Sequence, residues 1–217
     1  MGLLELLLPP ACAGCGRYGE LFCARCRRTL RPARTPDDRF SAADPGIVVG
    51  EMLELAMAAF VHEGAMRRAL QRLKYGGAAR LAACLADLSQ PAFVDLLHLG
   101  DHRPVVVPVP VHLDRLRQRG YNQAALLARE LAAWNGVSVA ESLVRVRPTT
   151  RQHGLGRAAR LHNLRGAFGP RDPLLEGRTV VLVDDILTTS ATLEACAEVL
   201  RASGASRVLG FAVAREV

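Results

Sequence analysis

Residues 180–192 (VVLVDDILTTSAT) hold the side chains best suited to chemistry, because an apolar run, two acids and a hydroxyl-rich turn follow one another. The run predicts a buried strand, and the turn predicts the start of a helix. Backbone N–H groups at a helix start attract phosphate, and carboxylates such as Asp184 and Asp185 accept hydrogen bonds from sugar hydroxyls. The turn consists of Thr188, Thr189, Ser190, Ala191 and Thr192. The segment therefore predicts a sugar-phosphate site, since a simple capped junction would need neither the acids nor so many hydroxyl groups.

Four cysteines near the amino terminus form two pairs with the spacing C-x2-C-x7-C-x2-C. They are Cys12, Cys15, Cys23 and Cys26. Two such pairs can surround one tetrahedral ion and leave no open position, which is the ligand arrangement of a structural zinc site. Two disulfides are the alternative and would require an exported protein. Cys84 and Cys196 lie in helical patterns rich in Ala and Leu, so we expect them in the core.

The composition indicates a basic protein whose core is built from aliphatic side chains. Half of the 217 residues are hydrophobic, only 5% are aromatic, and the formal net charge is +7. Arginine supplies nearly all the positive charge, since Lys74 is the only lysine. Such a surface favours phosphates, nucleic acid or acidic partners, although a solvated arginine-rich surface is the plainer explanation.

We expect a cytoplasmic protein without membrane insertion. No apolar run approaches the ~20 residues that cross a bilayer. Residues 1–10 lack the basic start of a signal peptide and include Glu5. Disulfides are rare in the cytoplasm, and this favours the metal site over the disulfides.

Residues 145–171 form a second basic feature, with seven arginines and no acid. We interpret this stretch as a flexible cationic flap. It could close over a pyrophosphate group, or follow the backbone of a single nucleic-acid strand while Tyr75, Tyr121 or Phe168 stacks on bases. About half of these arginines could equally be surface residues that contact only water.

Strand and helix patterns alternate along the rest of the chain, and this predicts an α/β fold with a parallel sheet flanked by helices. We expect a zinc-binding module and linker in residues 1–46, with the linker beginning near residue 30, and one α/β domain in residues 47–217. Strands are expected at residues 52–61, 104–110, 180–183 and 208–213. Helices are expected at residues 66–73, 123–133 and 193–200, with Asn122 capping the second. Residues 78–99 predict one or two helices interrupted by Pro91.

Several motifs resemble known families. Residues 180–192 resemble the phosphoribosyl-pyrophosphate (PRPP) motif of type I phosphoribosyltransferases, except that Ser190 stands where the motif normally has Gly. Residues 107–132 (VPVPVHLDRLRQRGYNQAALLARELA) resemble the ComF pattern of a V-P-V-P strand, arginines and an R-G-F/Y-N-Q turn. Residues 73–77 and 150–152 continue it. With the cysteine pairs, almost the entire chain resembles the ComF family, which implies a phosphoribosyltransferase-type domain behind a small zinc-ribbon-like module.

The resemblance also implies roles for individual residues. Asp184 and Asp185 would face the ribose as the catalytic acids, and residues 188–192 would hold the 5′-phosphate. The pyrophosphate or nucleic-acid loop would include Lys74, Arg115, Arg119, Asn122, Gln123 and Arg151. Structural Zn²⁺ is implied, together with Mg²⁺ that accompanies PRPP if the protein is an active enzyme.

Two functions follow as expectations. ComF relatives are associated with natural transformation, in which they handle incoming single-stranded DNA with a helicase and recombination mediator proteins. We therefore expect an accessory protein of DNA uptake that binds single-stranded DNA and retains a PRPP-type pocket. The alternative is an active phosphoribosyltransferase, and no segment identifies its acceptor base.

Overall fold

The computed structural model describes residues 9–33, 47–75, 79–99, 104–147, 163–171 and 175–216. Most of the expected linker and the middle of the arginine run, including Arg151, lie outside these residues. The strands are β1 (Ile47–Val48), β2 (Leu55–Val61), β3 (Val105–Pro108), β4 (Ser138–Val139), β5 (Leu143–Arg145), β6 (Phe168–Pro170), β7 (Thr179–Leu187) and β8 (Arg207–Arg215). The helices are α2 (Ala24–Arg27), α3 (Gly64–Tyr75), α4 (Ala79–Leu99), α5 (Leu113–Arg119), α6 (Gln123–Asn135) and α8 (Ala191–Ala202).

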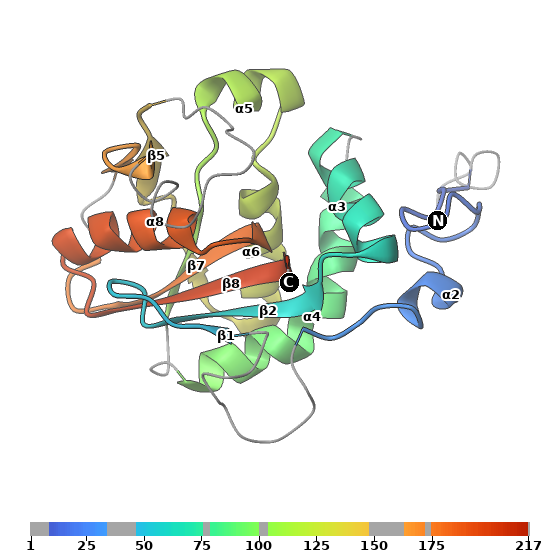
Figure 1. Ribbon diagram of the computed structural model, residues 1–217, viewed down its shortest axis with the longest axis horizontal. Coiled ribbons are helices and arrows are strands. Elements are labelled where there is room, and N and C mark those ends of the chain that lie inside the picture. Colours follow the sequence, from blue (N-terminus) through green and yellow to red (C-terminus); the bar gives the residue numbers. More distant parts are fainter. Residues whose placement is uncertain are drawn as a thin grey trace.

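The main sheet has six strands in the order β1-β2-β8-β7-β3-β4, and all of its pairs are parallel except the antiparallel edge pair β1-β2. Helices α4 and α6 pack on one face, while α8 packs on the other (Figure 1). The predicted α/β class with a parallel sheet is therefore confirmed. Strands β5 and β6 form a separate antiparallel pair.

Strand β7 is longer than the sequence pattern indicated. The acids were expected after the strand, but β8 pairs with β7 up to the pair Leu187–Arg215, so Asp184 and Asp185 lie inside the strand. Successive side chains of a strand point to opposite faces. Val181 and Val183 belong to the apolar cluster on the α3, α4 and α6 side, so Asp185 faces that side and Asp184 faces the α8 side.

Two other local expectations need correction, and one is confirmed. Residues 79–99 form one continuous helix, because Pro91 lies on its exposed face, where the loss of one backbone hydrogen bond is least costly. Arg115 and Arg119, which were expected in a loop, lie on a short helix, α5. Helix α6 is capped at its start by the side chain of Asn122, as predicted, and it ends at Gly136, which has a left-handed conformation.

The amino-terminal module packs directly against the α/β domain. Figure 1 shows α3 standing between the module and the sheet. Phe22 and Cys26 share an apolar cluster with residues of α3 and α4. The chain then leaves the module alongside β2, where the N–H of Val61 donates to the carbonyl of Arg31. Among the described residues, no helix is both long and apolar enough to cross a membrane.

Ser190 joins β7 to α8 in an unusual backbone conformation. Its φ of 60° makes it the one non-glycine residue with positive φ among the described residues. A side chain in this left-handed region costs about 1–2 kcal/mol. The position therefore suits the glycine that the PRPP motif normally carries.

We predict that Ser190→Gly raises the free energy of unfolding by about 0.5–1 kcal/mol, because the relieved strain exceeds the extra chain entropy of glycine. Ser203→Gly, at the other end of α8, is the control. Ser203 has a φ of −92°, so its replacement relieves no strain and should lower stability by roughly the same amount. Urea denaturation measures both variants. An unchanged or lower midpoint for Ser190→Gly would contradict the prediction.

Candidate functional site

A cavity of about 1130 Å³ lies at the carboxyl ends of the parallel strands. Ligands of open α/β sheets bind at this edge. The cavity collects residues from β7, the start of α8, α3, α5 and the ends of β2 and β8. Sequence-predicted residues in its wall are Lys74, Arg115, Arg119, Gln123, Asp184, Asp185, Thr188, Thr189, Ala191 and Thr192.

The two acids have different environments. Asp185 is buried, and its Oδ2 lies 2.7 Å from the Nζ of Lys74, with the two side chains only 6% and 14% exposed. Asp184 is half-buried on the other face of β7, and its Oδ1 accepts a hydrogen bond from the N–H of Asp185. Burial, followed by the neighbouring Asp185 carboxylate, raises the pKa of Asp184 well above its ordinary value, and Lys74 opposes that rise. The ammonium group of Lys74 therefore offsets part of the negative charge of the acid pair, which eases the approach of an anion.

The hydroxyl-rich turn follows directly at the end of β7. Thr188, Thr189 and Thr192 line the cavity, and α8 begins at Ala191. The first N–H groups of a helix have no acceptor within the helix. Ser190 lies behind this wall: it is buried, and its Oγ donates to the carbonyl of Thr189 at 2.5 Å. The turn can therefore offer backbone N–H and threonine hydroxyl donors to a phosphate.

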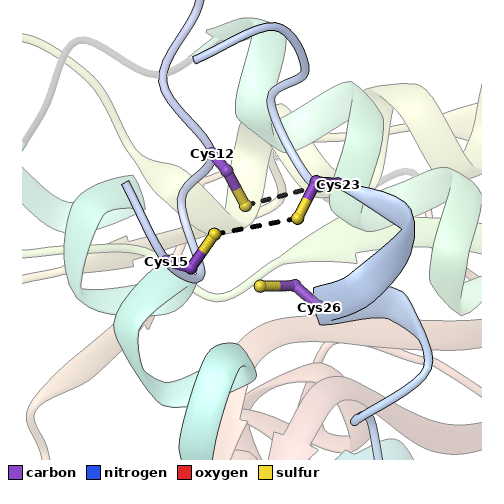
Figure 2. Close-up of side chains that lie close together, drawn as sticks. All are labelled: Cys12, Cys15, Cys23 and Cys26. Carbon is purple, nitrogen blue, oxygen red and sulfur yellow. Dashed lines mark hydrogen bonds between the residues drawn. The ribbon is translucent and has the colours of Figure 1, made fainter. Parts of the chain in front are cut away.

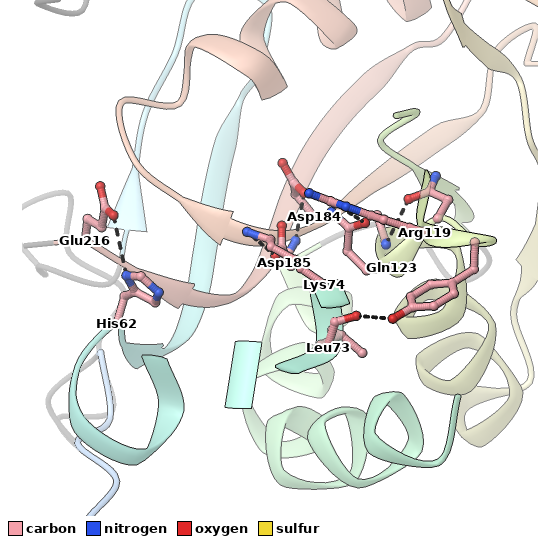
Figure 3. Close-up of polar contacts among 11 residues, drawn as sticks. His62, Leu73, Lys74, Arg119, Gln123, Asp184, Asp185 and Glu216 are labelled. Carbon is pink, nitrogen blue, oxygen red and sulfur yellow. Dashed lines mark hydrogen bonds and ion pairs between the residues drawn. The ribbon is translucent and has the colours of Figure 1, made fainter. Parts of the chain in front are cut away.

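The basic side of the cavity comes from α5 and the start of α6. Arg115 and Arg119 are half-buried, and Arg119 donates to the Oε1 of Gln123 at 3.0 Å. Arg119 also lies over the ring of Tyr75, 5.1 Å from its centroid. Asn122 is not in the cavity wall: its side chain caps α6 and donates to the carbonyl of Val109. Figure 3 shows Arg119 and Gln123 on one side of the Lys74–Asp185 pair.

The opposite side of the cavity was missed by sequence reasoning. His62 and Glu216 follow β2 and β8, and their side chains meet at 3.4 Å between Nδ1 and Oε1 (Figure 3). Burial lowers the pKa of His62. Arg31, at the start of the expected linker, also lines this side and pairs with Glu63 at 3.1 Å. His62 is a polar residue directly after the expected strand at residues 52–61, and this was the one sequence feature that could have indicated this side of the site.

Arg145 was expected only as part of the arginine run, but it lies in the cavity wall at the end of β5. Its guanidinium stands over the ring of Phe168, 5.3 Å from the centroid. Burial and the nearby Arg115 lower the pKa of Arg145. Arg115 and Arg145 both line the cavity, and neighbouring cations favour an anionic ligand.

The four amino-terminal cysteines converge as their spacing predicted (Figure 2). Their sulfur atoms all lie within 4.8 Å of one another, and all four are free thiols. The 3.7 Å between the sulfurs of Cys15 and Cys23 agrees with the ~3.8 Å edge of a tetrahedron whose metal–sulfur bonds are ~2.3 Å. The cluster can therefore hold a metal ion.

The surroundings of the cysteine cluster support this use. Burial alone would raise the pKa of Cys12, but N–H donors from Cys23, Cys15 and Gly14 lower it to about 6. Burial and the neighbouring thiols raise the pKa of Cys26 to about 12. A side chain at Gly14 would approach the sulfur of Cys26 to 2.7 Å, so only glycine fits there. The four sulfur atoms therefore lie close together, and a bound metal cation would stabilise their thiolate forms.

Known proteins are similar to this chain in sequence. The phosphoribosyl transferase domain family matches residues 86–215. DNA utilization protein YhgH of Salmonella typhimurium is 30% identical over 205 residues, which cover 89% of this chain and 90% of that protein. Competence protein F of Haemophilus influenzae is 28% identical over 211 residues, 95% of this chain and 85% of the relative. Competence protein ComFC of Bacillus subtilis is 28% identical over 165 residues, 76% of this chain and 65% of the relative.

The domain match spans more than half of the chain, and the relatives from Salmonella and Haemophilus match it over most of its length. The chain therefore belongs to the phosphoribosyl transferase domain family and, within it, to the ComF family.

Proposed function

We propose that the protein is a ComF-type accessory protein of DNA uptake that binds single-stranded DNA and retains a pocket for PRPP. The cavity at the strand ends carries the proposal, because it brings an acid pair, a hydroxyl-rich helix start and five arginines together. Two relatives bear the names competence protein F and DNA utilization protein. Their names support a role in DNA uptake, with a helicase and recombination mediator proteins as expected partners.

In the pocket, each group has a distinct task. The carboxylates of Asp184 and Asp185 accept hydrogen bonds from the ribose hydroxyls. The N–H groups at the start of α8 and the hydroxyls of Thr188, Thr189 and Thr192 hold the 5′-phosphate. Lys74, Arg115 and Arg145 offset the charge of the pyrophosphate. Mg²⁺ that arrives with PRPP would share this neutralisation.

Single-stranded DNA would bind at the mouth of the pocket. No residue of α5 is buried, and the side chain of Arg117 is 79% exposed. Of the three aromatic residues expected to stack on bases, Tyr75 is 65% exposed, whereas Phe168 is buried and Tyr121 is half-buried with its hydroxyl bound to the carbonyl of Leu73. Tyr75 is therefore the best stacking platform beside a row of arginines.

An active transferase is the second candidate, and the size of the cavity favours it. The wall continues past the acid pair to His62 and Glu216, which leaves room beside a phosphoribosyl group for an acceptor. The carboxylates would then stabilise the positive charge that develops on the ribose as pyrophosphate leaves.

For the cysteine cluster we propose structural Zn²⁺, because four thiolates without an open position are its common ligand set. The module is too short to bury a core of its own, so metal binding and its folding should be coupled.

We predict about one zinc per purified chain by elemental analysis. Cys15→Ser removes an exposed ligand and should lower both the zinc content and the urea midpoint, because metal-binding free energy contributes to folding. Cys84→Ser, on α4 and outside the cluster, is the matched control and should keep its zinc. Metal-free protein of full stability with disulfides in the module would refute the proposal.

We predict that Asp184→Asn combined with Thr189→Ala weakens PRPP binding about 10-fold or more, since hydrogen bonds to charged groups contribute about 1.5–3 kcal/mol each. Asp184 is chosen because replacing Asp185 would leave Lys74 buried without its partner. Calorimetric titration with PRPP and Mg²⁺ measures the affinity. Asp87→Asn, outside the cavity, is the control. Equal affinity in a folded double variant would exclude this PRPP site.

We predict that DNA affinity falls steeply with salt, with a log-log slope of ~0.7 per phosphate contact of a single strand. Arg117→Ala should reduce the slope by about one contact and leave PRPP affinity unchanged, because Arg117 does not line the cavity. Arg129→Ala, which removes an exposed arginine of α6 paired with Glu141, should leave the slope unchanged. Fluorescence anisotropy with an oligothymidylate measures the slopes. Absent DNA binding at low salt, together with pyrophosphate release from PRPP, would make the transferase the better assignment.

A further inference from the structure

Helix α3 contacts the cysteine cluster along one face. The Nε of Arg68 donates to the carbonyl of Gly14, and the Nη1 of Arg72 donates to the carbonyl of Cys12 at 2.9 Å. The two arginines are four residues apart and so lie on the same helix face. Both acceptor carbonyls belong to the short loop that presents Cys12 and Cys15. The loop is therefore held against the helix through its own backbone.

Close packing fixes the same contact. A side chain at Gly14 would come within 3.0 Å of the methyl group of Ala65, so the loop lies against the first turn of α3. Cys12, Met66 and Ala69 belong to one buried apolar cluster. The helix cannot shift along the module without breaking the hydrogen bonds and disturbing this packing.

The far end of α3 reaches the ligand site. Lys74 comes two residues after Arg72, or about 200° around the helix, so it points away from the module. Its Nζ is the partner of Asp185 at 2.7 Å. The carbonyl of Leu73 accepts a hydrogen bond from Tyr121, which fixes this last turn from the α6 side. One rigid helix therefore joins the cysteine loop to the acid pair.

We propose that Arg68 and Arg72 are positioning residues of the ligand site, through which metal occupancy of the cysteine cluster sets the anion affinity of the pocket. The carbonyls of Cys12 and Gly14 keep fixed positions when four sulfurs close on one ion. Without the ion, both arginines lose a defined acceptor and the last turn of α3 is less well held. Lys74 then neutralises the acid pair less well, and the two carboxylates repel phosphate. This regulation rests on the proposed PRPP pocket.

The test compares Arg68→Ala/Arg72→Ala with Arg25→Ala, which removes an exposed arginine from the module but leaves α3 unaltered. The double variant should keep about one zinc and its circular dichroism spectrum, but bind PRPP at least about 5-fold more weakly, the usual lower limit of coupling between sites. Arg25→Ala should bind PRPP as the unaltered protein does. Equal affinity in all three proteins would overturn the inference.

A mutant cycle that adds Lys74→Met to the arginine replacements distinguishes the positioning of Lys74 from a general loss of structure. If the arginines act through Lys74, their replacement should weaken PRPP binding much less in the Lys74→Met protein than in the unaltered one. Additive losses would show that they act elsewhere, and would reject the inference.

A readout without ligand separates this inference from the proposed function. Amide hydrogen exchange in the last turn of α3 should accelerate in the double arginine variant, and in the unaltered protein after a chelator removes its metal. Unaltered protein that fails to bind PRPP would refute the pocket assignment alone. Unchanged exchange in this turn would refute the linkage, whether or not PRPP binds.

Discussion

The buried ion pair between Lys74 and Asp185 fixes the position of α3 relative to β7. Lys74 belongs to α3, which carries the amino-terminal module, and Asp185 belongs to β7, which leads into the hydroxyl-rich turn. Loss of one partner from a buried pair costs about 3–5 kcal/mol, because the other charge stays buried without compensation. A guanidinium is larger and planar, so an arginine would not replace the compact ammonium group of Lys74 without moving the helix. The position of the module and the shape of the pocket therefore depend on the same contact.

Strand geometry explains why the consecutive acids Asp184 and Asp185 have different positions in the site. Because neighbouring side chains on β7 face opposite ways, Asp185 turns to α3 and Asp184 turns to α8. One acid thus anchors the pocket wall while the other remains half-buried at the cavity. The parallel pairing of β2, β8, β7 and β3 then brings His62, Glu216 and the acids to one edge of the sheet.

The parts that could be predicted from the sequence are those encoded by residues close together in the chain. The cysteine spacing, the Asn122 cap of α6 and the turn after β7 are local patterns with a local physical cause. The predicted limits of β7 were nevertheless wrong, because the length of β7 depends on its pairing with β8. The helix α5 was missed because a segment of seven residues with alternating basic side chains carries little periodic signal.

Long-range partners were beyond prediction because they depend on how the elements pack. Glu194 illustrates this: its buried carboxylate accepts hydrogen bonds from the N–H groups of Glu51 and Met52, both at 2.7 Å. A side chain at Gly50 would come within 2.1 Å of the same carboxylate, so glycine is required there. Neither residue shows this role in its local sequence. The pairs Lys74–Asp185 and His62–Glu216 escaped prediction for the same reason.

The composition of the chain gives this site an unusual chemical property. Lys74 is the only lysine, so apart from the α-amino group the protein has one primary amine, and that amine lies in the pocket. Its pairing with Asp185 and its low exposure should make it slow to react with acylating or reductive-methylation reagents. Amine-directed labelling would consequently report on this pocket without background from other lysines. An introduced ¹³C-methyl group would serve as a spectroscopic probe of whatever occupies the pocket.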